Sequence, residues 1–129
     1  MKHGDFNLAE STAILRYLSN FAKKTYLMDR VNPISVAETE NYISYHQQSM
    51  RPIARLVYGQ VFAPKDQRQF FDAAKDTQLV DTVFSNLLMN HPQITSEFIL
   101  EQGFSICDII LFCEVIQLNI VGYDLEGKY

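Results

Sequence analysis

The chain lacks the sequence features that mark several functional classes. It has no run of lysine or arginine, and its net charge of −4 argues against a nucleic-acid partner, because such proteins carry basic patches. Its three histidines, His3, His46 and His91, are scattered without the spacing of metal ligands, so no metal site is predicted. No glycine-rich phosphate loop and no Ser-His-Asp arrangement can be proposed. The sequence therefore gives no sign of these site types.

Long hydrophobic runs are also lacking. Residues Met1–Asp5 contain no apolar stretch of the kind found in signal peptides. The longest apolar stretch, residues 106–121, is interrupted by polar residues such as Asp108 and Glu114, and it is shorter than the roughly 20 residues that a membrane span needs. We interpret it as a buried core helix, and we expect a cytoplasmic protein that does not span a membrane.

Cysteine is scarce, with Cys107 and Cys113 as the two examples in the chain. Both lie in the same predicted helix, six residues apart. That spacing places them on different faces, so they cannot form a disulfide with each other. We therefore expect two reduced thiols, both of which act as small buried hydrophobic residues.

What the sequence does contain is a pattern for a mainly helical globular domain, with 47% hydrophobic and 20% charged residues. Alternation at Phe6 and Leu8 predicts a short strand, and helical spacing of apolar residues follows over 11–24. A linker is predicted over 25–33. A capping box, Ser35–Glu38, predicts the start of a long helix.

This long helix should end at Pro64, and Pro52 within it predicts a kink near residues 48–52. A second long helix is predicted over 66–90. The loop 91–104 carries apolar residues and should pack onto the body. Ser105 and Asp108 form a second predicted capping box, with Asp108 bonding back to the Ser105 amide. The helix that follows, to about residue 119, is apolar almost all round and should be surrounded by protein.

Three local patterns follow one another along the chain. The first is Phe6-x-Leu8-x-Glu10-Ser11-x-Ala13-Ile14-Leu15-x-Tyr17-Leu18. The second is Asn41–Tyr45 followed by Met50 and Arg51. The third is Phe98-Ile99, then Ser105–Ile109, then Glu114–Gln117. In this order the three patterns resemble the glutathione transferase family, and its theta class in particular. The resemblance implies a glutathione transferase C-terminal-type helical bundle in residues 33–129. Residues 1–25 would be a remnant, the last strand and helix of a thioredoxin-like domain.

The chain also departs from the family pattern. Counterparts of the family's first strand, first helix and cis-proline strand are not found, and no further helix is predicted before Tyr129. Cys107 stands where the family has a small alanine, and Pro52 is unusual at its place in the second pattern. The sequence therefore looks like a truncated transferase, which leaves open an incomplete gene model, a fragment or a diverged remnant.

The resemblance implies that Glu10 and Ser11 bind the γ-glutamyl end of glutathione, the co-substrate. Ser11 would offer its hydroxyl and backbone amide to the carboxylate at a helix start. Arg51, Tyr45 and Tyr58 would line the pocket for the electrophile. From the residues alone, each has a plainer alternative: an ordinary helix start, a solvated or ion-paired arginine, and tyrosines that pack half-buried.

Two functions follow from the resemblance, and a third interpretation rejects it. The first is a glutathione transferase-like protein, a cytoplasmic detoxification enzyme and possible dimer in the full-length family, with this chain inactive alone because it carries no catalytic residue. The second is a non-catalytic interaction module that uses apolar surface on the helix from Ser11 and on the long helix after it. The third is an unrelated helical bundle with chance matches.

Overall fold

The computed structural model describes residues 1–68, 72–91, 94 and 97–123, and it is mainly helical. A hairpin of β1 (Lys2–His3) and β2 (Phe6–Asn7) leads into α1 (Ser11–Phe21). A long helical rod follows and consists of α2 (Pro33–Tyr45), the π-helical turn η1 (His46–Met50), α3 (Arg51–Val57) and a second π-helical turn, η2 (Tyr58–Phe62). Then come α4 (Ala73–Asn90), α5 (Ile106–Val115) and the 3₁₀ helix η4 (Ile116–Val121).

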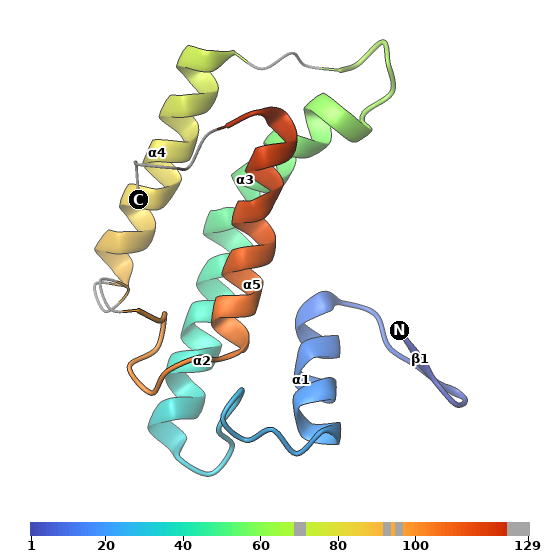
Figure 1. Cartoon of the computed structure of the whole chain (residues 1–129), viewed down its shortest axis with the longest axis vertical. Coiled ribbons are helices and arrows are strands. Elements are labelled where there is room, and N and C mark those ends of the chain that lie inside the picture. The colour runs from blue at the N-terminus through green and yellow to red at the C-terminus, as the bar shows by residue number, and fades with distance from the viewer. Residues whose placement is uncertain (69–71, 92–93, 95–96, 124–129) are drawn as a thin grey trace.

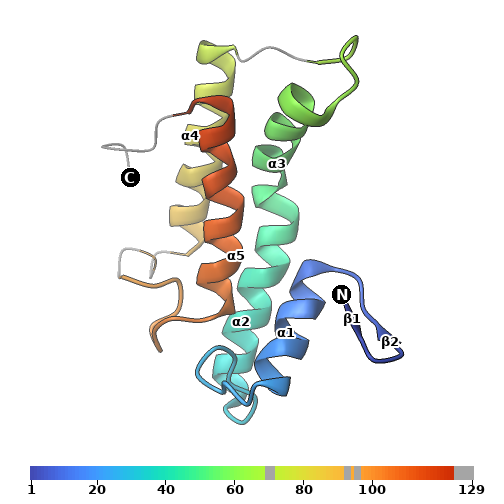
Figure 2. The same ribbon diagram turned by 45° about the vertical axis from the view of Figure 1, so that its right-hand side comes forward.

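Three long helical elements form the body. The α2–α3 rod and α5–η4 run in the same direction, and α4 runs the opposite way beside them (Figure 1). Helix α1 packs at the foot of the rod, and the hairpin projects from the body (Figure 2). Within the described ranges, no helix is long and apolar enough to cross a membrane.

The core lies between the rod, α4 and α5. The rod contributes Tyr42, Met50 and Ile53, all without exposed surface, and α4 contributes Val80 and Leu87. The loop before α5 also packs inward, as predicted, because Ile99 and Leu100 are buried. Burial of such side chains contributes about 1.5–3 kcal/mol each. Hydrophobic packing of residues far apart in sequence therefore holds the three elements together.

The predicted strand at Phe6 exists, and the chain itself provides its partner. Lys2 pairs with Asn7 and His3 with Phe6 in an antiparallel register. Gly4, with φ of 59°, makes the turn, in a conformation that glycine adopts without steric cost. The partner strand was not predicted, because two residues are too few to show an alternating pattern.

The predicted capping box at Ser35 is wrong. Helix α2 begins three residues earlier than predicted, at Pro33, and its N-cap is Asn32 in place of Ser35, with the Asn32 side chain accepting a hydrogen bond from the Ile34 amide. Proline is favoured in a first helical turn because its missing N–H has no partner there in any case. Ser35 instead lies inside the helix, is buried, and donates to Gln102 Oε1 at 2.6 Å. At the place of the kink predicted over 48–52, the structure has the π-helical turn η1, which ends two residues before Pro52.

Three further expectations need correction. Helix α4 begins at Ala73 rather than near residue 66, because Asp72 caps it by accepting from the Ala74 and Lys75 amides. The helix from Ser105 is not surrounded by protein among the described residues: Phe112 is 64% exposed, and Ile116 and Ile120 are also exposed. Cys107 is buried as predicted, but Cys113 is exposed. Periodicity cannot show which side of a uniformly apolar helix is covered.

Candidate functional site

Two neighbouring cavities lie along α3. The first, which we call the junction pocket, has a volume of about 230 Å³ between α1, the rod and α5. It is lined by Glu10, Ser11, Thr12, Leu15, His46, Gln47, Arg51, Ile110, Cys113, Glu114 and Gln117. The second, the arginine pocket, has about 400 Å³ and is lined by Arg51, Ala54, Arg55, Val57, Tyr58, Phe62 and Gln117. Because Arg51 and Gln117 line both, the two pockets adjoin.

The start of α1 forms one wall of the junction pocket. Glu10, the N-cap, has φ of 65° and ψ of 119°, a conformation uncommon for a residue other than glycine. Its carbonyl accepts the first helical bond, from the Ile14 amide at 2.9 Å, but its side chain makes no capping bond. The first amides of α1 therefore have no side-chain cap from Glu10.

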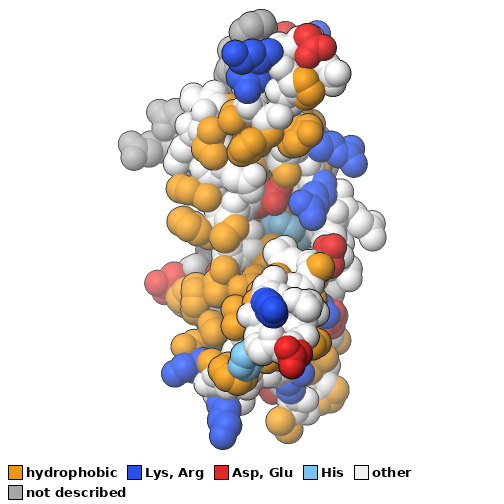
Figure 3. All heavy atoms as spheres, turned by 90° about the vertical axis from the view of Figure 1, so that its right-hand side faces the viewer, with side chains coloured by type: hydrophobic (Ala, Val, Ile, Leu, Met, Phe, Trp, Pro, Cys, Tyr) orange, Lys and Arg blue, Asp and Glu red, His pale blue; other side chains and the backbone are white. Residues whose placement is uncertain are grey.

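A hydrogen bond across the junction pocket fixes α1 to the rod. Gln47 Nε2 in the π-helical turn donates to Thr12 Oγ1 at 3.3 Å. Thr12 follows Ser11 directly, so this contact links the start of α1 to the rod, as does the ion pair between Arg16 and Glu40 further along α1. Figure 3 shows the hollow above α1, with histidine and acidic atoms at its bottom and basic side chains beside it.

A buried polar group, Glu114 with His46, forms the floor of the junction pocket. Glu114 Oε1 accepts a hydrogen bond from the Ala54 amide at 3.1 Å, and Glu114 Oε2 lies 3.6 Å from His46 Nε2. Both side chains are more than 90% buried. The hydroxyl of Tyr42 lies 3.4 Å from His46 Nδ1, and burial is the main cause that raises the pKa of Tyr42. Sequence reasoning did not predict this group, although a glutamate inside an apolar helix was a signal for it.

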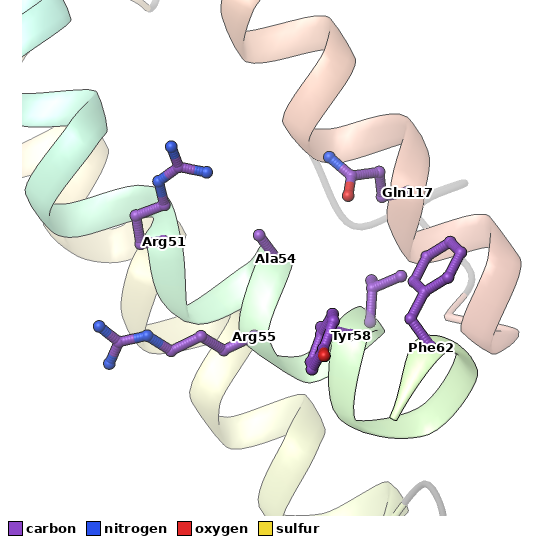
Figure 4. Close-up of a pocket in the computed structure, with 7 residues that line it drawn as sticks. Arg51, Ala54, Arg55, Tyr58, Phe62 and Gln117 are labelled. Atoms are coloured by element: carbon purple, nitrogen blue, oxygen red, sulfur yellow. The ribbon is translucent and has the colours of Figure 1, made fainter. Parts of the chain in front are cut away.

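The arginine pocket has a cationic end and an aromatic end. In Figure 4 the guanidinium groups of Arg51 and Arg55 lie toward one end, and the rings of Tyr58 and Phe62 lie toward the other. The two rings are stacked, with centroids 6.4 Å apart. Neither arginine forms an ion pair with a described residue. This arrangement can hold a small molecule with an apolar body and a negative or polarised group.

The predicted site residues are divided between the two pockets, and Tyr45 lines neither of them. The structure brings Glu10, Ser11 and Arg51 together in the junction pocket, and it places Tyr58 in the arginine pocket. The ring of Tyr45 instead packs edge-on against His91, with centroids 4.7 Å apart.

The predicted pair Ser105 and Asp108 has a structural role at the start of α5. The Ser105 amide donates to Asp108 Oδ2 at 2.7 Å, and the Cys107 amide donates to Ser105 Oγ at 3.2 Å. Asp108 Oδ1 also accepts from the Ile99 amide at 2.9 Å, so the same carboxylate holds the preceding loop. No group of three or more potential metal ligands is found within the described ranges.

The chain is 28% identical over 135 residues to glutathione S-transferase theta-1 of Gallus gallus. The match covers 97% of this chain and 49% of that protein, so the chain spans about half the length of the curated relative it matches. The similarity supports a glutathione transferase-like relationship. No family model matches the chain, and no solved structure matches it.

The mainly helical structure is compatible with the C-terminal helical domain of a glutathione transferase. The glutathione-binding role of Glu10 and Ser11, and the pocket role of Arg51, Tyr45 and Tyr58, remain predictions.

Proposed function

We propose that the junction pocket binds the γ-glutamyl end of glutathione at Glu10 and Ser11, in a glutathione transferase-like protein of the theta class. The observation that carries this proposal is the cavity itself, which brings the start of α1 to Arg51. Ser11 would donate to the ligand carboxylate, and Glu10 would accept from its amino group. The positive φ of Glu10 adds support, because backbone strain of this kind costs about 1–3 kcal/mol and concentrates at functional sites.

The arginine pocket would then hold a small electrophile next to the glutathione thiol. Arg51 lines both pockets and would stabilise negative charge on the leaving group, while Tyr58 would contact the apolar body. In this proposal residues 1–25 correspond to the end of a thioredoxin-like unit and residues 33–129 to the helical unit. In the full-length family the reaction is attack of the glutathione thiolate on the electrophile.

Calorimetric titration of the chain with glutathione tests the binding step. We expect measurable binding that weakens about three- to tenfold in Ser11→Ala, since a hydrogen bond contributes about 0.5–1.5 kcal/mol. Ser85→Ala, an exposed serine on α4, is the matched control and should bind like the unmodified chain. Equal affinity in Ser11→Ala and Ser85→Ala, or no binding at millimolar glutathione, would contradict the proposal.

We further propose that this chain alone has negligible conjugating activity. The roles assigned to Glu10, Ser11, Arg51 and Tyr58 are binding and charge stabilisation, and none of them lowers the pKa of the glutathione thiol. Incubation with glutathione and a chloronitrobenzene should therefore give the uncatalysed rate. A rate well above that value, lost in Arg51→Gln, would show that the chain is an enzyme by itself.

The exposed apolar surface favours a second candidate, a non-catalytic interaction module. Leu18 and Phe21 are exposed on α1, and Tyr58 and Phe62 are exposed at the end of the rod. Exposed patches of this kind favour association, with a second copy of the chain or with another protein. Sedimentation velocity distinguishes the candidates: a monomer at all concentrations that binds glutathione favours the first, and concentration-dependent association without glutathione binding favours the second.

A further inference from the structure

A third cavity, which we call the phenylalanine pocket, lies at the start of α5, away from the two pockets described above. It has a volume of about 360 Å³ and is lined by Glu97, Phe98, Phe104, Asp108, Ile109 and Phe112. Glu97, Phe98 and Phe104 come from the loop before α5, and Asp108, Ile109 and Phe112 come from α5 itself. None of its lining residues belongs to the junction pocket or the arginine pocket, so a ligand could bind here without contacting either of them.

Aromatic rings dominate the lining of this pocket. Phe98 and Phe104 meet edge to face, with centroids 6.2 Å apart and an interplanar angle of 70°. Phe104 is 47% exposed and Phe112 is 64% exposed, so ring surface is available to a ligand. The face of an aromatic ring carries negative potential and attracts a cation within about 6 Å of its centre.

The charged groups of the pocket are both carboxylates. Asp108 is fixed in the wall by bonds from the amides of Ile99 and Ser105, and Glu97 is exposed. The start of α5 carries about half a positive charge from its dipole, which the full charge of Asp108 exceeds. No lysine or arginine lines the pocket among the described residues. The local field therefore favours a positive ligand.

The sequence extends this charge pattern well beyond the pocket. Between Lys75 and Lys128 it contains eight acidic residues and no lysine or arginine. Residues 1–75, in contrast, contain ten basic and seven acidic residues. An asymmetry of this kind between the two parts of a chain indicates a preference for partners of the opposite charge. An anionic ligand would meet repulsion in the phenylalanine pocket, and an uncharged one would lack the charge–charge attraction to the carboxylates.

We propose that the phenylalanine pocket binds an organic cation, a small molecule with an alkylated ammonium group. The ammonium carbons would contact the faces of Phe98, Phe104 and Phe112. Its charge would be balanced by Glu97 at the rim and by Asp108 in the wall. Alkylation suits this pocket because the lining offers apolar surface around the charge and few hydrogen-bond acceptors that are not already engaged. This site does not depend on glutathione binding.

The test compares choline with 3,3-dimethyl-1-butanol, which has the same shape without the charge, by nuclear magnetic resonance titration of the labelled chain. Choline should bind more tightly, with shift changes that include the amides of Phe104 and Phe112. Benzyltrimethylammonium should bind more tightly than choline because its ring adds apolar contact. Equal affinity for choline and the uncharged alcohol, or shift changes confined to residues of the other pockets, would overturn the proposal.

Two surface variants test separately how the carboxylate charge and the aromatic ring contribute to choline binding. Phe112→Leu should weaken choline binding about two- to fivefold, since one exposed cation–ring contact contributes a factor of that size. Glu97→Gln should weaken it by up to about fivefold, since one exposed charge pair contributes at most a factor of that size. Both side chains are exposed, so neither change is expected to unfold the chain. Glu101→Gln, on the same loop, and Phe62→Leu, in the arginine pocket, are the matched controls and should bind choline like the unmodified chain. If the two test variants bind like the controls, the assignment is wrong.

Discussion

The carboxylate of Glu114 accepts a hydrogen bond from the backbone amide of Ala54, 60 residues earlier in the chain. Ala54 lies in the first turn of α3, directly after the π-helical turn and Pro52, where the regular amide-to-carbonyl pattern is interrupted. A side chain of α5 thus supplies an acceptor to the backbone of the rod. The same carboxylate lies against His46, and together these contacts join α5 to the rod beneath the junction pocket.

Loss of this carboxylate should be strongly destabilising. Glu114→Ala removes the acceptor and leaves the Ala54 amide and His46 buried with fewer partners, so we expect a loss of about 2–4 kcal/mol in the free energy of unfolding. Urea titration measures it. Glu101→Ala, at an exposed position, should change the same quantity by less than about 0.5 kcal/mol. If the two variants unfold at the same urea concentration, Glu114 does not join the helices as described.

The second prediction concerns the cap of α5. Asp108→Ala removes the acceptor for the Ser105 and Ile99 amides, and it should destabilise the chain by about 1–2 kcal/mol. The comparison variant is Asp66→Ala, at an exposed turn. An unchanged midpoint for Asp108→Ala in a denaturant titration would count against its role as a cap.

The third prediction concerns the two thiols, which should differ greatly in reactivity. Burial is the main cause that raises the pKa of Cys107 to about 12, so almost none of it is thiolate at pH 8. Cys113 is exposed. Titration of the native chain with a disulfide reagent at pH 8 should therefore show one fast thiol, lost in Cys113→Ser, and a second that reacts only after unfolding. Two thiols of equal rate in the native chain would contradict the burial of Cys107.

The fourth prediction is a loss of stability in mild acid. Burial lowers the pKa of His91 below its ordinary value of 6.5, so the folded chain favours the neutral ring while the unfolded chain takes up a proton. Stability should accordingly fall as pH drops below about 6.5, by up to about 1.4 kcal/mol per pH unit from this group. His91→Gln should unfold more easily at pH 7.5 but show a shallower fall between pH 6.5 and pH 5. An identical slope in the variant would assign the effect to other groups.

Much of the secondary structure could be predicted from the sequence because its signals are local. The apolar spacing after Ser11, the pair Ser105 and Asp108, and the stop before Pro64 each depend on neighbours a few residues away. The errors also have local causes. Ser35 and Glu38 have the spacing of a capping box, but Asn32 and Pro33 offer a helix start three residues earlier, and the helix begins there.

The candidate site was predictable only in part. Glu10, Ser11, Arg51 and Tyr58 were selected by resemblance to known sequences, and the structure places them along two adjoining pockets. Tyr45 belongs to the same helical rod, but its side chain lies against His91 instead. A position on a helix gives the direction of a side chain only after the neighbours of that helix are known.

The sequence by itself determined that the chain is mainly helical, that a helix follows Ser11, and which residues cap α5, because backbone preferences and capping act over one or two turns. The tertiary structure alone decided that Glu114 meets His46 and Ala54, that Cys113 faces solvent while Cys107 does not, and that carboxylates and phenylalanine rings surround one cavity. These outcomes depend on which apolar faces of distant helices come together. The free energy gained by burying those faces depends on contacts between all the helices, so no single segment of the sequence determines it.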